Sequence, residues 1–327
     1  MKALVYTAPE ALQFRDVPEP EAAPDHHLIR IDSSGICGSD MHAYLGHDDR
    51  RPAPLILGHE AAGIITGGPR DGDRVTINPL VTCGTCPACL AGRDNLCETR
   101  QIISMPPREG AFAEFVAMPE RNLVTVPGHI SLEQAALAEP VAVGWHAVRL
   151  GIAALPGDMA QTALVIGGGA IGVAAALSLI AQGVGQVTLI EPNPLRRVYL
   201  NLSAHITVLA PDEIDGQLFD ITVDGVGFEA TRATACAATR PGGVIVHVGL
   251  GGGGAGLDIR RMTLQEITFI GTYTYTAQDF RDTCAAMFDG RLGPLDWIET
   301  RHLSDGAAAF SDIRTGRVAA PKIILKP

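Results

Sequence analysis

The pattern of hydrophobic and polar positions along the chain changes near residue 160. Up to that point the apolar runs are short, of β type, and interrupted by Gly and Pro. They are "HHLIRI", "AAGIIT", "DRVTI" and "AFAEFVAM". Short runs bounded by turn residues predict strands, and the irregular sequence between them predicts loops that carry most of the unusual residues. We therefore expect an irregular, mostly β domain in the first half of the chain.

Beyond residue 160, buried-strand segments alternate with helix-like segments in most places. The strand candidates are "TALVIGG", "QVTLIE", "DITVDGV", "GGVIVHVGL" and "ITFIGTY". This alternation predicts a parallel, doubly wound sheet and places the chain in the α/β class. After about Tyr275 the pattern becomes one helix, "AQDFRDTCAAMFDG", followed by a short strand-like end, "PKIILKP".

One apolar stretch, "ALVIGGGAIGVAAALSLIA", is long enough to resemble a membrane span. It opens with a β-type run, breaks at three glycines and resumes as a helix-like pattern. A strand, turn and helix buried in an α/β sheet gives the same hydropathy. We therefore predict no interaction with a membrane.

The length and net charge of the chain limit the number of domains and the kinds of partner that we expect. The chain has 327 residues, which exceeds what one hydrophobic core usually supports, so about two domains are expected. The net charge is −11 and no basic run occurs, which argues against nucleic acid as a partner. The N-terminal segment lacks the pattern of a secretory signal, so we expect a cytoplasmic, reducing compartment. Clustered cysteines are then metal ligands or redox groups rather than disulfides.

A glycine-rich turn follows the strand "TALVI". Its sequence "GGGAIG" supplies Gly167, Gly169 and Gly172 in G-x-G-x-x-G order, with Ala170 and Ile171 between the last two glycines. Such a turn lets backbone N–H groups at a helix N-terminus approach a pyrophosphate. Methyltransferases that bind adenosylmethionine, and ordinary tight turns, share this feature.

The next strand, "QVTLIE", ends at Glu191, whose carboxylate is placed to accept hydrogen bonds from an adenosine ribose. A carboxylate would repel a 2′-phosphate, so the sequence favours NAD over NADP. Arg196 and Arg197 count slightly against this choice, because an arginine at that point can bind a phosphate. The alternative for Glu191 is a solvated strand end.

Four cysteines, Cys83, Cys86, Cys89 and Cys97, follow the spacing C-x2-C-x2-C-x7-C. Four thiolates complete a tetrahedral shell and leave no open position, which predicts a structural zinc. An iron–sulfur cluster is the nearest alternative, but its proline-flanked fourth cysteine is absent. Unbound thiols are the remaining alternative.

Four further residues are candidates for an open metal site: Cys37 in "GICGSDMH", His59 and Glu60 in "LGHEAAG", and Glu139 in "LAEPVAVGWHA". Taken singly, Cys37 can be a buried apolar thiol, His59 a core histidine and Glu139 a helix-starting carboxylate. Residue type alone therefore does not establish a metal site.

In combination, these segments resemble the zinc-containing medium-chain alcohol dehydrogenases. The resemblance rests on "CGSDMH", on "GHE" with the downstream "GDRV", on the four-cysteine segment and on "GGGAIG", in this order, and it spans nearly the whole chain. It implies a GroES-like β-barrel catalytic domain that is split in sequence, 1–139 and 275–327. It also implies a doubly wound Rossmann domain for NAD, 140–274.

The resemblance further implies the ligands of a catalytic zinc. Cys37 and His59 match two ligands, and Glu139 matches the third, which is a glutamate in the sorbitol-dehydrogenase-like branch. Glu60 matches a glutamate beside the metal, which is either an outer group or an exchangeable ligand.

Three more residues match groups around this zinc. Asp40 matches the carboxylate that orients the zinc histidine, and Ser39 and His42 match a relay that carries the alcohol proton to solvent. The implied activity is hydride transfer from a secondary alcohol, polyol or vicinal diol to NAD, with zinc acting as a Lewis acid.

The substrate is less defined. "GTYTYT" resembles a segment of sorbitol dehydrogenases, but Thr274 stands where those enzymes have arginine. Tyr275 and Tyr44 are kept, and they are candidates for contacting the substrate. Threonine or a sugar acid such as idonate are alternative substrates. A non-catalytic zinc-ribbon and nucleotide-sensing module is the alternative from another class. The resemblance also implies a homodimer or homotetramer, with "ITFIGTY" as a candidate edge strand.

Overall fold

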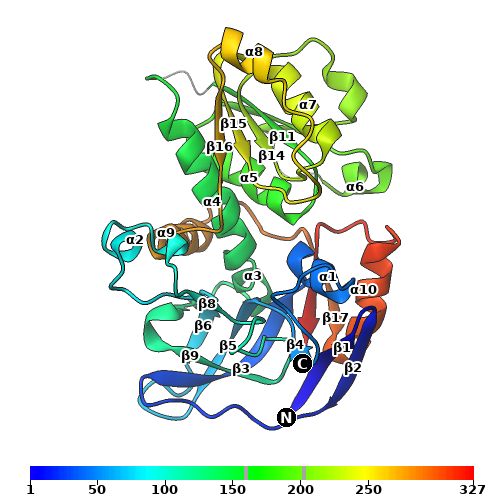
Figure 1. The fold of residues 1–327 in the computed structure, drawn as a ribbon. Coiled ribbons are helices and arrows are strands. Elements are labelled where there is room, and N and C mark those ends of the chain that lie inside the picture. Colours follow the sequence, from blue (N-terminus) through cyan, green and yellow to red (C-terminus); the bar gives the residue numbers. More distant parts are fainter. Residues whose placement is uncertain (158–160, 201–203) are drawn as a thin grey trace. The chain divides into compact units, whose positions relative to one another are not determined.

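The computed structural model describes residues 1–157, 161–200 and 204–327, and these residues form two compact units (Figure 1). Unit 1 contains Met1–Glu139, Phe280–Phe288 and Leu295–Pro327. Unit 2 contains Pro140–Asp279 and Asp289–Pro294. Residues 275–279 and 289–294 thus group with unit 2, whereas the resemblance implies a catalytic-domain segment that runs from 275 to 327.

Unit 1 is built mainly from antiparallel strands. Strand β3 (His26–Gly35) lies in its main sheet and pairs with β5 (Glu60–Thr66), β9 (Phe115–Pro119) and β18 (Lys322–Lys326). The sheet order is β10-β6-β5-β3-β18-β17, which places the C-terminal strand β18 beside β3. The four strands predicted in the first half are confirmed as β3, β5, β6 and β9. Alternate residues of these strands, such as Ile29 and Ile31, are buried in a hydrophobic cluster.

The other elements that lie wholly in unit 1 are short. The strands are β1 (Lys2–Ala8), β2 (Ala11–Asp16), β4 (Leu55–Ile56), β6 (Arg74–Ile77), β7 (Leu80–Val81), β8 (Gln101–Ile102), β10 (Leu123–Thr125) and β17 (Ile298–His302). The helices are α1 (Gly38–Tyr44), α2 (Pro87–Leu90), α3 (Leu132–Ala135) and α10 (Gly306–Arg314).

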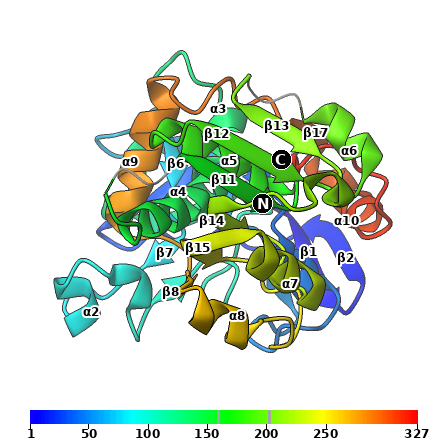
Figure 2. The ribbon, with the colours of Figure 1, turned by 90° about the horizontal axis from the view of Figure 1, so that it is seen from above.

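Unit 2 contains one parallel sheet in the order β13-β12-β11-β14-β15-β16. Figure 2 labels the strands from β13 to β15 in this order, and Figure 1 labels β16. The strands are β11 (Thr162–Ile166), β12 (Gln186–Ile190), β13 (Ile206–Leu209), β14 (Phe219–Asp224), β15 (Thr239–His247) and β16 (Thr268–Gly271). The five strands predicted in this half are confirmed, and β16 is an edge strand as expected. Strand β13 was not predicted; it has only four residues, of which Ile206 alone is buried.

Helices precede, connect and follow these strands. They are α4 (Ala138–Ala153), which begins in unit 1, α5 (Ala170–Ala181), α6 (Pro194–Tyr199), α7 (Glu229–Ala238), α8 (Ile259–Leu264) and α9 (Ala277–Phe288), which ends in unit 1. Helix α5 is apolar on all sides because it packs on β11 and β12 and is buried from Gly172 to Leu179. None of the described helices is long and apolar enough to cross a membrane. The strand order reverses between β11 and β14, the point at which such sheets bind nucleotides at their carboxyl ends.

Candidate metal centres and cofactor site

The structure brings Cys37, His59 and Glu60 together in unit 1, with one ligand atom from each lying within 4.8 Å of the others. Cys37 is the residue before α1, and Glu60 begins β5 directly after His59. The antiparallel register of β3 and β5 places Gly35 opposite Glu60, which brings the two segments side by side. A thiol, an imidazole and a carboxylate at this spacing form a donor set suited to zinc.

Asp40 fixes the geometry of this group. Its Oδ2 accepts a hydrogen bond of 3.0 Å from the backbone N–H of Cys37, and its Oδ1 lies 3.4 Å from Nδ1 of His59. Burial opposes the charged form of His59, but the negative charges of Asp40 and Cys37 outweigh it and raise the histidine pKa well above its usual value. Nε2 of His59 faces away from Asp40, at 3.4 Å from Oγ of Ser39.

Glu60 is fully buried, and its two carboxylate oxygens differ. Oε1 accepts a hydrogen bond of 2.6 Å from Nζ of Lys322, while Oε2 has no hydrogen-bond partner among the described residues. A Cβ on Gly35 would lie only 2.1 Å from that Oε2, so the carboxylate occupies the space that a larger residue at position 35 would fill.

The unpartnered Oε2 of Glu60 indicates whether a metal ion would fit among Cys37, His59 and Glu60. A buried carboxylate oxygen without a partner is costly, and a cation beside Cys37 and His59 would satisfy it. The residues present therefore fit a zinc ion, with Cys37, His59 and Glu60 as the donors that the structure brings together.

Glu139 lies outside this 4.8 Å group, although it is buried in the first turn of α4. Its charge contributes, with those of Glu60 and Cys37, to a raised pKa of Lys322, against the opposing effect of burial. His42 is exposed on α1. Lys322 was not predicted as a site residue, because nothing in the sequence around β18 indicates that its ammonium group lies against Glu60.

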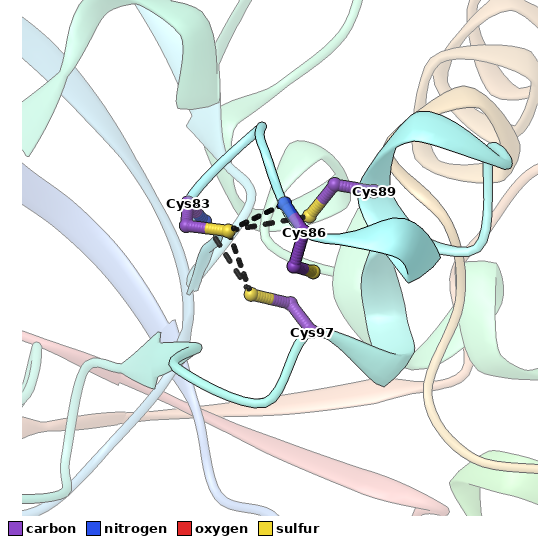
Figure 3. A group of neighbouring side chains, drawn as sticks. All are labelled: Cys83, Cys86, Cys89 and Cys97. Carbon is purple, nitrogen blue, oxygen red and sulfur yellow. Dashed lines mark hydrogen bonds between the residues drawn. The ribbon is translucent and has the colours of Figure 1, made fainter.

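The four cysteines converge in a second group, in which the sulfur atoms lie within 4.8 Å of one another (Figure 3). Sγ of Cys83 is 3.5 Å from Sγ of Cys97 and 3.9 Å from Sγ of Cys89. Four sulfurs at 2.3 Å from a tetrahedral zinc would be about 3.8 Å apart, so the observed spacing fits this metal.

Backbone groups of the same segment stabilise a thiolate in this cluster. The N–H groups of Thr85 and Cys86 donate to Sγ of Cys83 and lower its pKa to about 5. Burial and the neighbouring thiol of Cys86 instead raise the pKa of Cys89 to about 12. Thiols this close do not all ionise without a cation between them, because the thiolates repel one another. A zinc ion bound by all four sulfurs would offset this repulsion.

The glycine-rich turn of unit 2 connects β11 to α5. Gly167 has φ 97°, which an L side chain rarely adopts, and a Cβ on Gly172 would lie 1.7 Å from the carbonyl oxygen of Gly167. A Cβ on Gly169 would meet no protein atom within 4 Å, and Ala170 and Ile171 form the first turn of α5. The first and third glycines are thus required by the turn itself, whereas the second leaves open space beside a helix N-terminus.

Glu191 directly follows β12 and is buried, so it is not a solvated strand end. Oε2 accepts a hydrogen bond of 2.8 Å from the N–H of Gly168, and Oε1 accepts one of 2.8 Å from the N–H of Asn193. A carboxylate has lone pairs for further donors, so it can also accept from ribose hydroxyls. Arg196 lies half-buried on α6, and Arg197 donates to the carbonyl oxygen of Glu191.

The two tyrosines that are candidates for contacting the substrate lie in different units. Tyr44 of unit 1 is buried against Phe310, with ring centroids 5.2 Å apart. Tyr275 of unit 2 is also buried. The neighbouring Thr274 has φ 46°, and its buried hydroxyl has no hydrogen-bond partner among the described residues. A β-branched residue in this conformation is an outlier that marks local strain.

Two family models match the chain: "Alcohol dehydrogenase GroES-like domain" over residues 23–128 and "Zinc-binding dehydrogenase" over residues 170–289. L-galactonate-5-dehydrogenase of Escherichia coli is 32% identical, covering 89% of this chain and 88% of that protein. Probable D-xylulose reductase A of Neosartorya fischeri is 29% identical, covering 94% and 91%. The crystal structure of 2R,3R-butanediol dehydrogenase from Bacillus subtilis superimposes with a TM-score of 0.86 at 25% identity, covering 100% and 99%.

Proposed function

Since the chain belongs to the zinc-containing medium-chain alcohol and polyol dehydrogenases, which use zinc and NAD, we propose that Cys37, His59, Glu60 and Glu139 form its catalytic metal centre. The observation that carries this proposal is the convergence of Cys37, His59 and Glu60, together with a buried carboxylate oxygen of Glu60 that has no partner among the described residues. A zinc ion bound there would supply a Lewis acid that polarises the hydroxyl of the substrate.

The protein groups around this centre orient the ligands and move the proton. Asp40 holds the ring of His59 and the N-terminal end of α1. The hydroxyl of Ser39, half-buried beside Nε2 of His59, takes the proton of the alcohol, and the exposed His42 on the same helix passes it to solvent.

The cofactor is bound by unit 2. The N–H groups at the start of α5 bind the pyrophosphate beside Gly167, Gly169 and Gly172, and Glu191 accepts hydrogen bonds from the adenosine ribose. The buried carboxylate of Glu191 disfavours a 2′-phosphate, which supports NAD over NADP. Arg196 contributes to the adenosine side of the same site.

The substrate is a secondary alcohol, polyol or vicinal diol, and Tyr44 of unit 1 and Tyr275 of unit 2 are candidate residues for its recognition. The names of the relatives, a galactonate dehydrogenase, a xylulose reductase and a butanediol dehydrogenase, support this class. Thr274 in place of an arginine argues against sorbitol. A sugar acid is the second candidate, because the L-galactonate-5-dehydrogenase acts on one by name.

The assembly is a homodimer or homotetramer in the cytoplasm. The exposed edge strand β16, with Phe269 38% exposed, supports pairing through this edge. The cysteine-rich metal sites support a reducing compartment.

A substrate panel with metal analysis tests the function. About twenty polyols, diols and sugar acids are assayed with NAD and with NADP, and zinc is counted per chain for the wild type and Cys37→Ser. Turnover with NAD, its loss in Cys37→Ser and retention of the cysteine-bound zinc are expected. NAD binding without turnover on any compound would instead indicate the nucleotide-sensing module, and full activity of Cys37→Ser would contradict the assigned centre.

A further inference from the structure

Nδ1 of the His59 ring has two oxygen acceptors, whereas Nε2 on the other side of the ring lies beside Ser39. Nδ1 lies 3.2 Å from Oγ of Ser104 and 3.4 Å from Oδ1 of Asp40. We propose that Ser104 is a positioning residue of the metal centre, which holds the Nδ1–H tautomer of His59 and so presents Nε2 to the zinc. This inference rests on the proposed function, because it presumes that His59 is a zinc ligand.

Asp40 alone does not define the ring position. Its Oδ1 also accepts a hydrogen bond of 3.1 Å from the N–H of Gly58, and its Oδ2 accepts the N–H of Cys37. Nδ1 carries a single hydrogen in the tautomer that frees Nε2, and Ser104 offers the nearer acceptor. The serine hydroxyl therefore shares with Asp40 the task of fixing the ring.

The backbone of Ser104 is held in an unusual conformation that suits this contact. Its φ is 70°, in the left-handed region, and its side chain is completely buried. A non-glycine residue rarely adopts this conformation, and such outliers persist where the surrounding structure fixes them, often at functional sites.

A buried arginine holds the segment in place. Nε of Arg51 donates a hydrogen bond of 3.0 Å to the carbonyl oxygen of Ser104, and Nη1 of Arg51 is fixed by Oδ2 of Asp48 at 2.5 Å. Arg51 is only 3% exposed, so this pairing is shielded from solvent. A buried ion pair on another segment of unit 1 thus holds the backbone of Ser104 in place.

The chain reaches Ser104 directly from the four-cysteine segment. After Cys97, strand β8 pairs with β7, Ile103 donates to the carbonyl oxygen of Pro79, and Ser104 follows. The cysteine cluster therefore anchors a segment that ends on the ring of His59. If Ser104 positions His59, the segment from Cys97 to Ser104 links the cysteine cluster to the metal centre of Cys37, His59 and Glu60.

Two substitutions separate the hydroxyl from the backbone. Ser104→Ala removes the hydroxyl and keeps a Cβ at φ 70°, whereas Ser104→Gly removes the hydroxyl and relieves the conformation. Ser178→Ala is the matched control, because Ser178 is a completely buried serine of unit 2 whose hydroxyl has no partner among the described residues.

The experiment measures the release of zinc from each holoenzyme to a chromophoric chelator, and the visible spectrum after replacement of zinc by Co²⁺. We expect both Ser104 variants to bind the zinc at His59 about tenfold more weakly or worse, with a shifted Co²⁺ spectrum, and the cysteine-bound zinc to be unchanged. Ser178→Ala should release both ions as the wild type does. Denaturant unfolding reports whether each variant is folded.

Wild-type zinc release in both Ser104 variants would overturn the proposal. A defect in Ser104→Ala that Ser104→Gly lacks would also overturn it, because the residue would then serve only the backbone. A wild-type enzyme that binds zinc at the cysteines alone would refute the proposed catalytic centre itself, and with it the role of Ser104, so the two failures are distinguishable.

Discussion

Nζ of Lys322 donates a hydrogen bond of 2.6 Å to Oε1 of Glu60, and both side chains are buried. The same ammonium donates to the carbonyl oxygen of Ile36 at 2.9 Å, directly before Cys37. One lysine on the C-terminal strand thus fixes both the carboxylate and the backbone next to the thiol of the candidate metal centre. The pair neutralises a buried charge that would otherwise be costly.

Lys322→Met should therefore destabilise unit 1. It leaves the buried carboxylate of Glu60 without its ammonium, and breaking a buried pair in this way typically costs about 3–5 kcal/mol. Guanidinium unfolding of the metal-free protein is the measurement. Added zinc should recover part of the loss, because the cation would compensate the same carboxylate.

The double variant Lys322→Met with Glu60→Gln is the control for this pair. It removes both charges, so it should be more stable than Lys322→Met alone. Equal destabilisation by the single and the double variant would mean that Lys322 acts through packing rather than through Glu60.

The two candidate zinc sites should lose their zinc ions independently of each other. Cys97→Ala removes a fully buried sulfur, 3.5 Å from Sγ of Cys83, and should abolish the cysteine-bound zinc while the other zinc stays. Cys37→Ser should show the reverse pattern. Zinc content after gel filtration measures both variants, and loss of both ions from Cys37→Ser would contradict two separate sites.

The glycine-rich turn allows a test in which stability and cofactor binding separate. Gly169→Ala should leave the free energy of unfolding within about 0.5 kcal/mol, because its Cβ would meet no protein atom within 4 Å. It should nevertheless weaken NAD binding by about tenfold or more, since the methyl group would occupy the approach of the pyrophosphate. Calorimetric titration with NAD and thermal unfolding measure the two effects.

Gly172→Ala is the contrasting variant. Its Cβ would lie 1.7 Å from the carbonyl oxygen of Gly167, so the turn must distort and stability should fall by about 2 kcal/mol or more. Unchanged NAD affinity in Gly169→Ala would show that the turn does not bind a pyrophosphate.

Asp279 should make the stability of unit 2 depend on pH. Burial disfavours its charged form, but hydrogen bonds from His146, Arg149 and Thr276 outweigh this effect and hold its pKa far below the usual value. A carboxyl whose pKa is lower in the folded than in the unfolded state stabilises the fold above the unfolded pKa of about 3.9, and loses this effect as pH falls further.

Asp279→Asn should consequently destabilise the protein at pH 5 by about 2 kcal/mol or more, and this difference from the wild type should shrink towards pH 3. Thermal unfolding over this range measures it. Asp289→Asn, at an exposed pair with Arg291, is the control and should change stability by less than about 1 kcal/mol. A difference that stays constant between pH 5 and pH 3 would exclude the ionised carboxylate as the cause.

Features defined by neighbouring residues could be predicted from the sequence alone. The cysteine spacing requires only one loop, and "GGGAIG" requires only one strand, one turn and one helix. The strands β11, β12 and β14 were found for the same reason, since each contains a local run of apolar and β-branched residues. Local chemistry and local periodicity carry this information.

The tertiary structure decided which distant residues meet. Cys37 and His59 come together because β3 pairs with β5 in a particular register, and Lys322 reaches Glu60 because β18 lies beside β3. It also placed Glu60 in the 4.8 Å group with Cys37 and His59, left Glu139 outside that group, and brought Ser104 into contact with the histidine. Strand pairing over long sequence separations sets these contacts, and no segment of the chain encodes that pairing by itself.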